Sequence, residues 1–199
     1  LHRHLKDDER VTLTDETEAF AVIGLMGPLA AQVADAVGAG ALSDLKFFAH
    51  SEVHVAGKPV RGVRLSYVGE PGWELTMAAS DAPAIYDALS AAGARAAGTL
   101  AQTSMRIEKR FLSYGHDLDT DITPLEAGLE FAIDWSKDFI GKAALLKRRE
   151  AGVSTKMVSM ILDDASAVPL GNEPIYLGSD IIGQTTSAAF GYRVGKPVA

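Results

Sequence analysis

The 199-residue sequence contains no cysteine, which excludes disulfide bonds, thiolate metal sites and a cysteine nucleophile. No apolar run approaches the roughly 20 residues that a membrane-spanning helix needs, and residues 1–10 are charged where a signal peptide would be apolar. Basic residues are fewer than acidic residues, with 19 Lys and Arg against 26 Asp and Glu. Nucleic acids and anionic membranes would repel a chain of net charge −7. We therefore expect a cytoplasmic protein whose partners are small molecules or other proteins, not nucleic acid or membrane.

The composition is that of an ordinary globular protein, with 47% hydrophobic and 23% charged residues. Apolar residues in short runs or in alternation predict strands, and apolar residues at three- and four-residue spacing predict helices. Strands are expected at residues 11–13, 19–25, 47–55, 61–68, 124–131, 157–162, 173–177 and 181–186, with a further strand that starts at Trp73. Helices are expected at residues 28–37, 80–93, 99–111 and 142–150, the second of them capped by Ser80 and Asp81. Strand-rich segments that are each followed by a helix indicate an open α+β arrangement.

A hairpin over residues 61–75 is the most informative stretch. Glu70-Pro71-Gly72-Trp73 provides Pro and Gly where a type II turn needs them. A loop of two or of four residues places Tyr67 and Glu74 on the same face of the sheet, because side chains alternate with a period of two. A carboxylate beside an aromatic ring suits a flat heterocycle such as a pterin, whose ring N–H and exocyclic amine can both donate to it. By spacing alone, a structural hairpin with Tyr67 and Trp73 in the core and Glu74 in solvent is the better interpretation.

Three other patterns do not support a site. Gly24-Leu25-Met26-Gly27 follows a strand but lacks the third glycine and the acidic residue of a dinucleotide-binding motif. His50 and His54 are four residues apart, which on a strand separates them by about 13 Å, so we expect ordinary strand histidines and no metal. The alternating aspartates of residues 117–121 lack the glycine and the bidentate glutamate of a calcium loop, which favours a solvated loop.

Residues 65–75 resemble the signature of the glycine-cleavage T-protein (aminomethyltransferase) family. Four later segments resemble further blocks of that family in the right order: residues 104–109, 114–118, 123–129 and 138–142. The run Thr186-Ser187-Ala188-Ala189-Phe190-Gly191-Tyr192 is similar to one in the folate-binding C-terminal part of FAD-dependent sarcosine and dimethylglycine dehydrogenases. The resemblance covers about residues 11–199, and the set is specific because the blocks are co-linear.

The resemblance implies α+β folate-binding subdomains with open sheets and covering helices, followed by a C-terminal β-barrel. We expect the folate-binding domain at residues 1–152 and the start of the barrel at residues 153–199, with strands needed to close it missing. The open barrel edge should then be covered by a neighbouring chain or be poorly ordered. Because the chain opens on Leu1 in mid-pattern, it resembles a piece of a longer polypeptide.

The resemblance also implies roles for individual residues. Glu74 and Tyr67 match the positions that hold the pterin, and Phe131 resembles an aromatic stacking position, with plain core packing slightly favoured for it. Arg106 is a candidate for binding tetrahydrofolate, and an internal ion pair with Glu108 or Glu126 is equally supported.

Two positions depart from the family pattern. Gln102 stands where many T-proteins have arginine, and Arg110 where they have glycine, so a folate contact from position 102 is in doubt.

The function that the resemblance implies is capture of a one-carbon unit by tetrahydrofolate as 5,10-methylenetetrahydrofolate. In the dehydrogenase type, an FAD-dependent oxidoreductase domain outside this chain generates the iminium. The family's catalytic carboxylate lies in a segment with no counterpart after Leu1, so we expect this chain alone to be inactive. The alternatives are a stand-alone glycine-cleavage T-protein, another folate-dependent demethylase, or a non-catalytic folate-binding or interface module.

Overall fold

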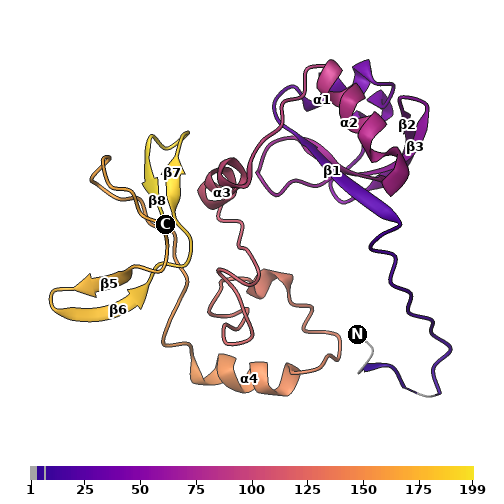
Figure 1. The fold of residues 1–199 in the computed structure, drawn as a ribbon. Coiled ribbons are helices and arrows are strands. Elements are labelled where there is room, and N and C mark those ends of the chain that lie inside the picture. Colours follow the sequence, from indigo (N-terminus) through magenta and orange to yellow (C-terminus); the bar gives the residue numbers. More distant parts are fainter. Residues whose placement is uncertain (1–3, 7) are drawn as a thin grey trace. The chain divides into compact units, whose positions relative to one another are not determined.

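The computed structural model describes residues 4–6 and 8–199. It divides into two units (Figure 1). Unit 1 takes in the chain up to Ser66 and Glu70–Ala96, and unit 2 takes in Tyr67–Gly69 and Ala97–Ala199. Helices and antiparallel sheets occur in both units, which confirms the predicted α+β class.

Unit 1 is built on one antiparallel sheet with the strand order β1-β4-β3-β2. Its elements in chain order are β1 (Phe20–Met26), α1 (Ala30–Ala36), a 3-10 helix (Gly40–Asp44), β2 (His50–Val55), β3 (Lys58–Val63), β4 (Gly72–Ala78), a second 3-10 helix (Ala79–Asp81) and α2 (Ala82–Ala91). Helices α1 and α2 lie on the same face of this sheet (Figure 1).

The core of unit 1 lies between that face and the two helices. Alternate residues of β4 point into it, and Trp73, Leu75 and Met77 are at most 3% exposed. They pack in one cluster with Ile85 and Leu89 of α2, which recur at the helical spacing of four. The opposite face of the sheet is therefore the one left for side chains such as Glu74 and Thr76.

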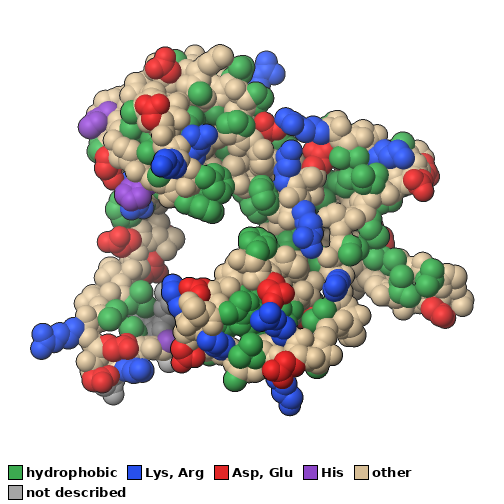
Figure 2. Space-filling model, turned by 180° about the vertical axis from the view of Figure 1, so that it is seen from behind, with side chains coloured by type: hydrophobic (Ala, Val, Ile, Leu, Met, Phe, Trp, Pro, Cys, Tyr) green, Lys and Arg blue, Asp and Glu red, His purple; other side chains and the backbone are tan. Residues whose placement is uncertain are grey.

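Unit 2 contains two helices and two small hairpins. Its elements are α3 (Thr99–Glu108), a 3-10 helix (Glu130–Ala132), α4 (Lys142–Ala151), β5 (Pro174–Leu177), β6 (Asp180–Gln184), β7 (Ala189–Gly191) and β8 (Lys196–Val198). The hairpin β5–β6 exposes the apolar side chains of Tyr176, Leu177, Ile181 and Ile182. Green atoms mark them on the lower of the two projections at the right of Figure 2. Within the described residues, the strands of this unit pair only as two-stranded ribbons, and they form no closed barrel.

All four predicted helices are present as α1, α2, α3 and α4. Asp81 occupies the N-cap position of α2, as predicted, but neither Ser80 nor Asp81 caps the helix with a side-chain hydrogen bond. The Asp81 carboxylate instead forms an ion pair with Lys58 Nζ at 2.9 Å. Of the helices that the described residues form, none is long and apolar enough to cross a membrane.

Three predicted strands are absent. Residues 11–13 are exposed and belong to no element. Residues 123–129 form tight turns instead, with Leu129 N donating to Pro124 O at 2.8 Å and Gly128 at φ +70°. Residues 157–162 form no strand but make an isolated bridge, Ile161 to Val198, with backbone bonds between Met160 and Ala199 and from Leu162 N to Pro197 O.

Candidate functional site

The structure overturns the predicted register of the central hairpin. Glu74 of β4 pairs with Val63 of β3 on one side and with Gly24 of β1 on the other. Tyr67 is not in a strand at all, since β3 ends at Val63 and β4 begins at Gly72. The expectation that the hairpin itself places Tyr67 beside Glu74 is therefore wrong.

Arg64, the residue after β3, is bonded to the chain before β2. Its backbone N–H donates to Ala49 O at 2.9 Å and its carbonyl accepts from Phe48 N at 2.8 Å. Its guanidinium also donates to the carbonyls of Ser43 at 3.2 Å and Leu45 at 2.5 Å. These bonds hold Arg64 against residues 43–49, whereas the pairing of β3 with β4 ends at Val63.

Glu74 occupies an inner strand on the sheet face that the helices do not cover. Its side chain is partly buried, and no hydrogen bond or ion pair to its carboxylate exists among residues 4–6 and 8–199. Its neighbour Gly24 leaves room beside it, because a Cβ at that position would meet only Met26 Cε, at 3.6 Å. The carboxylate is thus accessible and has its acceptor capacity free.

The surface next to Glu74 is apolar on the β1 side. Phe20 and Val22 lie on the same face as Gly24 and are 50% and 58% exposed. A flat ring with two parallel N–H donors could bind Glu74 in a charge-assisted bidentate pair and lie against such apolar surface. The residues of unit 1 therefore fit the pterin chemistry predicted for Glu74.

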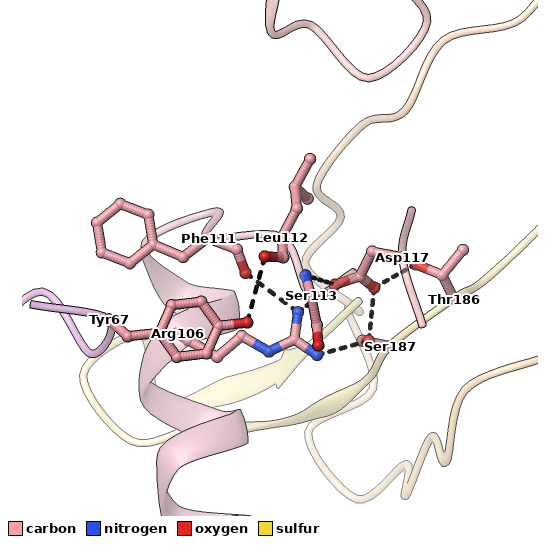
Figure 3. A network of polar contacts seen from close by, with 8 residues as sticks. All are labelled: Tyr67, Arg106, Phe111, Leu112, Ser113, Asp117, Thr186 and Ser187. Carbon is pink, nitrogen blue, oxygen red and sulfur yellow. Dashed lines mark hydrogen bonds and ion pairs between the residues drawn. The ribbon is translucent and has the colours of Figure 1, made fainter. Parts of the chain in front are cut away.

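In unit 2, Arg106 of α3 lies in a buried polar network (Figure 3). It forms an ion pair with Asp117, and both residues are 4% exposed. Arg106 also donates to Phe111 O at 3.1 Å and to Ser187 Oγ at 2.7 Å. The internal ion pair expected as one alternative for Arg106 is therefore present, but its partner is Asp117 and not Glu108 or Glu126.

Four donors converge on the Asp117 carboxylate. Besides Arg106, these are Ser187 Oγ at 2.5 Å, Thr186 Oγ1 at 2.6 Å and Ser113 N at 2.8 Å. Burial by itself raises the pKa of Asp117, but the hydrogen bonds and the Arg106 charge outweigh it and hold this pKa below the usual value. Asp117 is therefore a buried anion that the protein itself neutralises and solvates.

Tyr67 lies at the other end of the same network. Its hydroxyl donates to Leu112 O at 3.2 Å, and its ring lies nearly parallel to Phe111, with centroids 6.3 Å apart and planes at 16°. Tyr67 is partly buried. Along α3, Ser104 and Ile107 are buried, whereas Leu100 is 86% exposed.

Phe131 sits in the 3-10 helix Glu130–Ala132 and is 85% exposed. Core packing, which was the slightly favoured interpretation of this residue, is therefore wrong. An exposed phenylalanine at this position is free to contact a ligand or another protein.

A cavity beside the Arg106–Asp117 pair has about 30 Å³ of room for water. It is lined by both members of the pair and by residues such as Met157 and Ser187. That volume corresponds to about one or two waters. No group of three or more His, Asp and Glu side chains is placed to hold a metal ion in the part of the chain that the structure describes.

The sequence alone did not single out Asp117, Ser187 or Thr186. Asp117 and Arg106 are 11 residues apart, and the two hydroxyls come from a segment about 70 residues further on. The available signal was that all of them fall in segments that resemble family blocks. Spacing rules could not join them, because these contacts depend on tertiary structure.

Comparison with known proteins agrees with the resemblance. The family model for the GCVT N-terminal domain matches residues 1–137, and the model for the glycine cleavage T-protein C-terminal barrel domain matches residues 156–199. Human mitochondrial dimethylglycine dehydrogenase is 36% identical over 197 residues, which is 95% of this chain and 23% of that protein. The aminomethyltransferase of Thermosynechococcus vestitus is 35% identical over 190 residues, which is 95% of this chain and 52% of that protein.

A solved structure leads to the same assignment. The crystal structure of glycine cleavage system aminomethyltransferase T from Bartonella henselae matches with a TM-score of 0.78 and 25% identity, over 90% of this chain and 50% of that one. The chain thus spans about half the length of the aminomethyltransferases it matches and about a quarter of the dehydrogenase. From the two family models and these similarities, the chain belongs to the glycine cleavage T-protein family.

Proposed function

We propose that this chain is the tetrahydrofolate-binding, aminomethyltransferase-type part of an FAD-dependent dehydrogenase of the sarcosine or dimethylglycine type. In this function the one-carbon unit of an N-methyl amine leaves as 5,10-methylenetetrahydrofolate. The flavin belongs to an oxidoreductase domain outside this chain, in the same polypeptide or complex. Family membership and the similarity to dimethylglycine dehydrogenase over 95% of the chain support the proposal.

The observation that carries folate binding is the free carboxylate of Glu74. It is partly buried, has no partner among the described residues and lies beside Gly24, which leaves the sheet surface open. Such a carboxylate loses hydration without gaining a protein donor, and a ligand with two N–H groups would restore both bonds.

In this proposal, bound tetrahydrofolate supplies two amines that accept the one-carbon unit. Glu74 holds and orients the pterin edge, and Tyr67 and Phe131 are proposed aromatic contacts. Arg106 contributes by fixing the polypeptide, because both of its terminal nitrogens already donate to protein acceptors.

The test is calorimetric titration of folinic acid into this chain and into its Glu74→Gln variant. Glutamine keeps one acceptor but presents an N–H to a ligand donor, so we expect binding to weaken by about ten- to a hundred-fold. Glu52→Gln is the matched control, because Glu52 belongs to the same sheet, is exposed and lies away from Glu74 on the edge strand β2.

The titration tests both the role of Glu74 and folate binding by the parent chain. Equal affinity of Glu74→Gln and the parent chain would remove Glu74 from the site. No binding by the parent chain, with a normal melting curve, would favour the interface-module alternative over a folate site.

A stand-alone aminomethyltransferase is the second candidate, and the 35% identity to the Thermosynechococcus vestitus enzyme favours it. Antibodies against this chain can separate the two by the size of the native polypeptide. A polypeptide about four times as long as this chain, with flavin absorbance, would match the dehydrogenase type. One about twice as long, without flavin, would match the aminomethyltransferase.

A further inference from the structure

A continuous chain of contacts in unit 2 runs from Asp117 to the ring of Tyr67 (Figure 3). Asp117 binds Arg106, Arg106 donates to Phe111 O at 3.1 Å, and the next carbonyl, Leu112 O, accepts from the Tyr67 hydroxyl at 3.2 Å. The solvated loop predicted for residues 117–121 is wrong at Asp117, which is 4% exposed.

The first part of this chain is fixed by burial. Asp117 and Arg106 are both 4% exposed, and Ser187, which bridges them, is 6% exposed. Neither charge can exchange its partner for bulk water, and an unpaired charge at such a depth is strongly unfavourable. The guanidinium of Arg106 is therefore held in one position.

In the second part of the chain of contacts, hydrogen bonds attach the backbone just after α3 to the ion pair. Phe111 N donates back to Arg106 O at 2.9 Å, while Phe111 O accepts from the guanidinium of the same residue. Ser113 N, two residues further on, donates to Asp117 at 2.8 Å. Residues 111–113 are thus attached to the ion pair on both sides of Leu112, the residue whose carbonyl holds Tyr67.

Tyr67 depends on this short segment for its orientation. Its hydroxyl is bonded to Leu112, and its ring lies at 16° to the ring of Phe111. Tyr67 belongs to a three-residue piece of the chain in unit 2, Tyr67–Gly69, and residues 64–71 form no strand that could hold it by a ladder.

We propose that Asp117 is a positioning residue that sets the orientation of the Tyr67 ring through Arg106 and residues 111–113. The inference deepens the proposed function, on which it rests in so far as Tyr67 contacts the folate. Asp117 itself acts only through protein groups. In this view the carboxylate controls ligand affinity without touching the ligand.

The first test needs no folate. The full 199-residue chain contains five tyrosines, so labelling with 3-fluorotyrosine gives few fluorine resonances, and Tyr67→Phe identifies that of Tyr67. We expect Asp117→Asn to shift or broaden this resonance, whereas the control Asp121→Asn removes an exposed charge from the same loop and leaves it unchanged. An unchanged Tyr67 resonance in Asp117→Asn would overturn the proposal.

If Asp117→Asn does not fold, Ser187→Ala replaces it in the same measurement. This variant removes one donor from Asp117 and one acceptor from Arg106 but keeps the ion pair. A shifted Tyr67 resonance supports the proposal, and an unchanged one contradicts it.

The second test is a double-mutant cycle in folinic acid affinity with Asp117→Asn and Tyr67→Phe. We expect each single change to weaken binding by roughly tenfold and the double variant to be no weaker than either. Additive losses, near a hundred-fold, would show that Asp117 does not act through Tyr67. A parent chain that binds no folinic acid would contradict the proposed function and leave the fluorine experiment to decide the role of Asp117.

Discussion

The buried pair Arg106–Asp117 makes a strong prediction for the stability of unit 2. In Arg106→Met, Asp117 keeps its bonds from Ser187, Thr186 and Ser113 but loses its only counter-charge in the network. Removing one partner of a buried pair costs about 3 to 5 kcal/mol, because a charge is left unpaired. We expect a value near 3 kcal/mol here, since three hydrogen bonds remain.

The double variant Arg106→Met with Asp117→Asn separates charge burial from packing. Asparagine still accepts hydrogen bonds from the hydroxyls of residues 186 and 187 but carries no charge. The double variant should therefore be more stable than Arg106→Met by about 2 kcal/mol, although it contains one more substitution.

Urea unfolding followed by circular dichroism measures these free energies. Arg149→Met is the control, because the ion pair between Arg149 and Glu130 is about half exposed at both ends and should contribute far less. A loss below about 1 kcal/mol in Arg106→Met, or additive losses in the double variant, would refute the reasoning about a buried unpaired charge.

Three further predictions concern other parts of the chain. Gly24→Leu should fill the space beside Glu74 and weaken folinic acid binding at least about tenfold with an unchanged melting temperature, and unaltered affinity in calorimetry would contradict this. Hydrogen bonding to Arg148 and to Thr123 lowers the pKa of Glu126 from 4.5 to about 2. The stability that ionised Glu126 contributes to the fold is therefore present above pH 4.5 and is lost as pH falls towards 2. In Glu126→Gln the melting temperature should change less over that interval than in the parent chain, and equal pH dependence of the two melting temperatures would count against this reasoning. Trp73→Phe should lose the bond from Nε1 to Leu42 O, which then keeps only its bond from Leu45 N; the expected cost is about 0.5 to 1.5 kcal/mol by urea unfolding, and full stability would show that this bond is dispensable.

Sequence patterns predicted the sheet-and-helix layer of unit 1 well, because its elements bury one face each. In β4, every second residue from Trp73 is apolar and buried, and α2 presents Ile85 and Leu89 at the helical spacing. Such periodicity follows from geometry within one element. It needs no knowledge of what lies on the other side of the core.

The register of the central hairpin was predicted wrongly, because it depends on more than one element. The type II turn predicted at Glu70–Trp73 is wrong, because Gly72 is already the first residue of β4 and does not have the positive φ that such a turn needs. The pairing of β3 with β4 ends at Val63, and residues 64–71 form no strand. Because register depends on where both strands end, the partner of Glu74 is Val63 and not Gly69 or Tyr67.

The partners of the charged residues of α3 could not be predicted from sequence either. Sequence proximity paired Arg106 with Glu108 or Glu126, but Glu108 accepts bonds from the backbone of Arg193 and Val194, and Glu126 pairs with Arg148. These acidic groups are satisfied by segments up to 86 residues away. A buried charge selects its partner by the geometry of the folded chain, because every donor at that depth must be matched at once. The same requirement explains why a family block can be recognised from sequence while the roles of its residues, ligand contact or internal support, are separated only by the contacts they make.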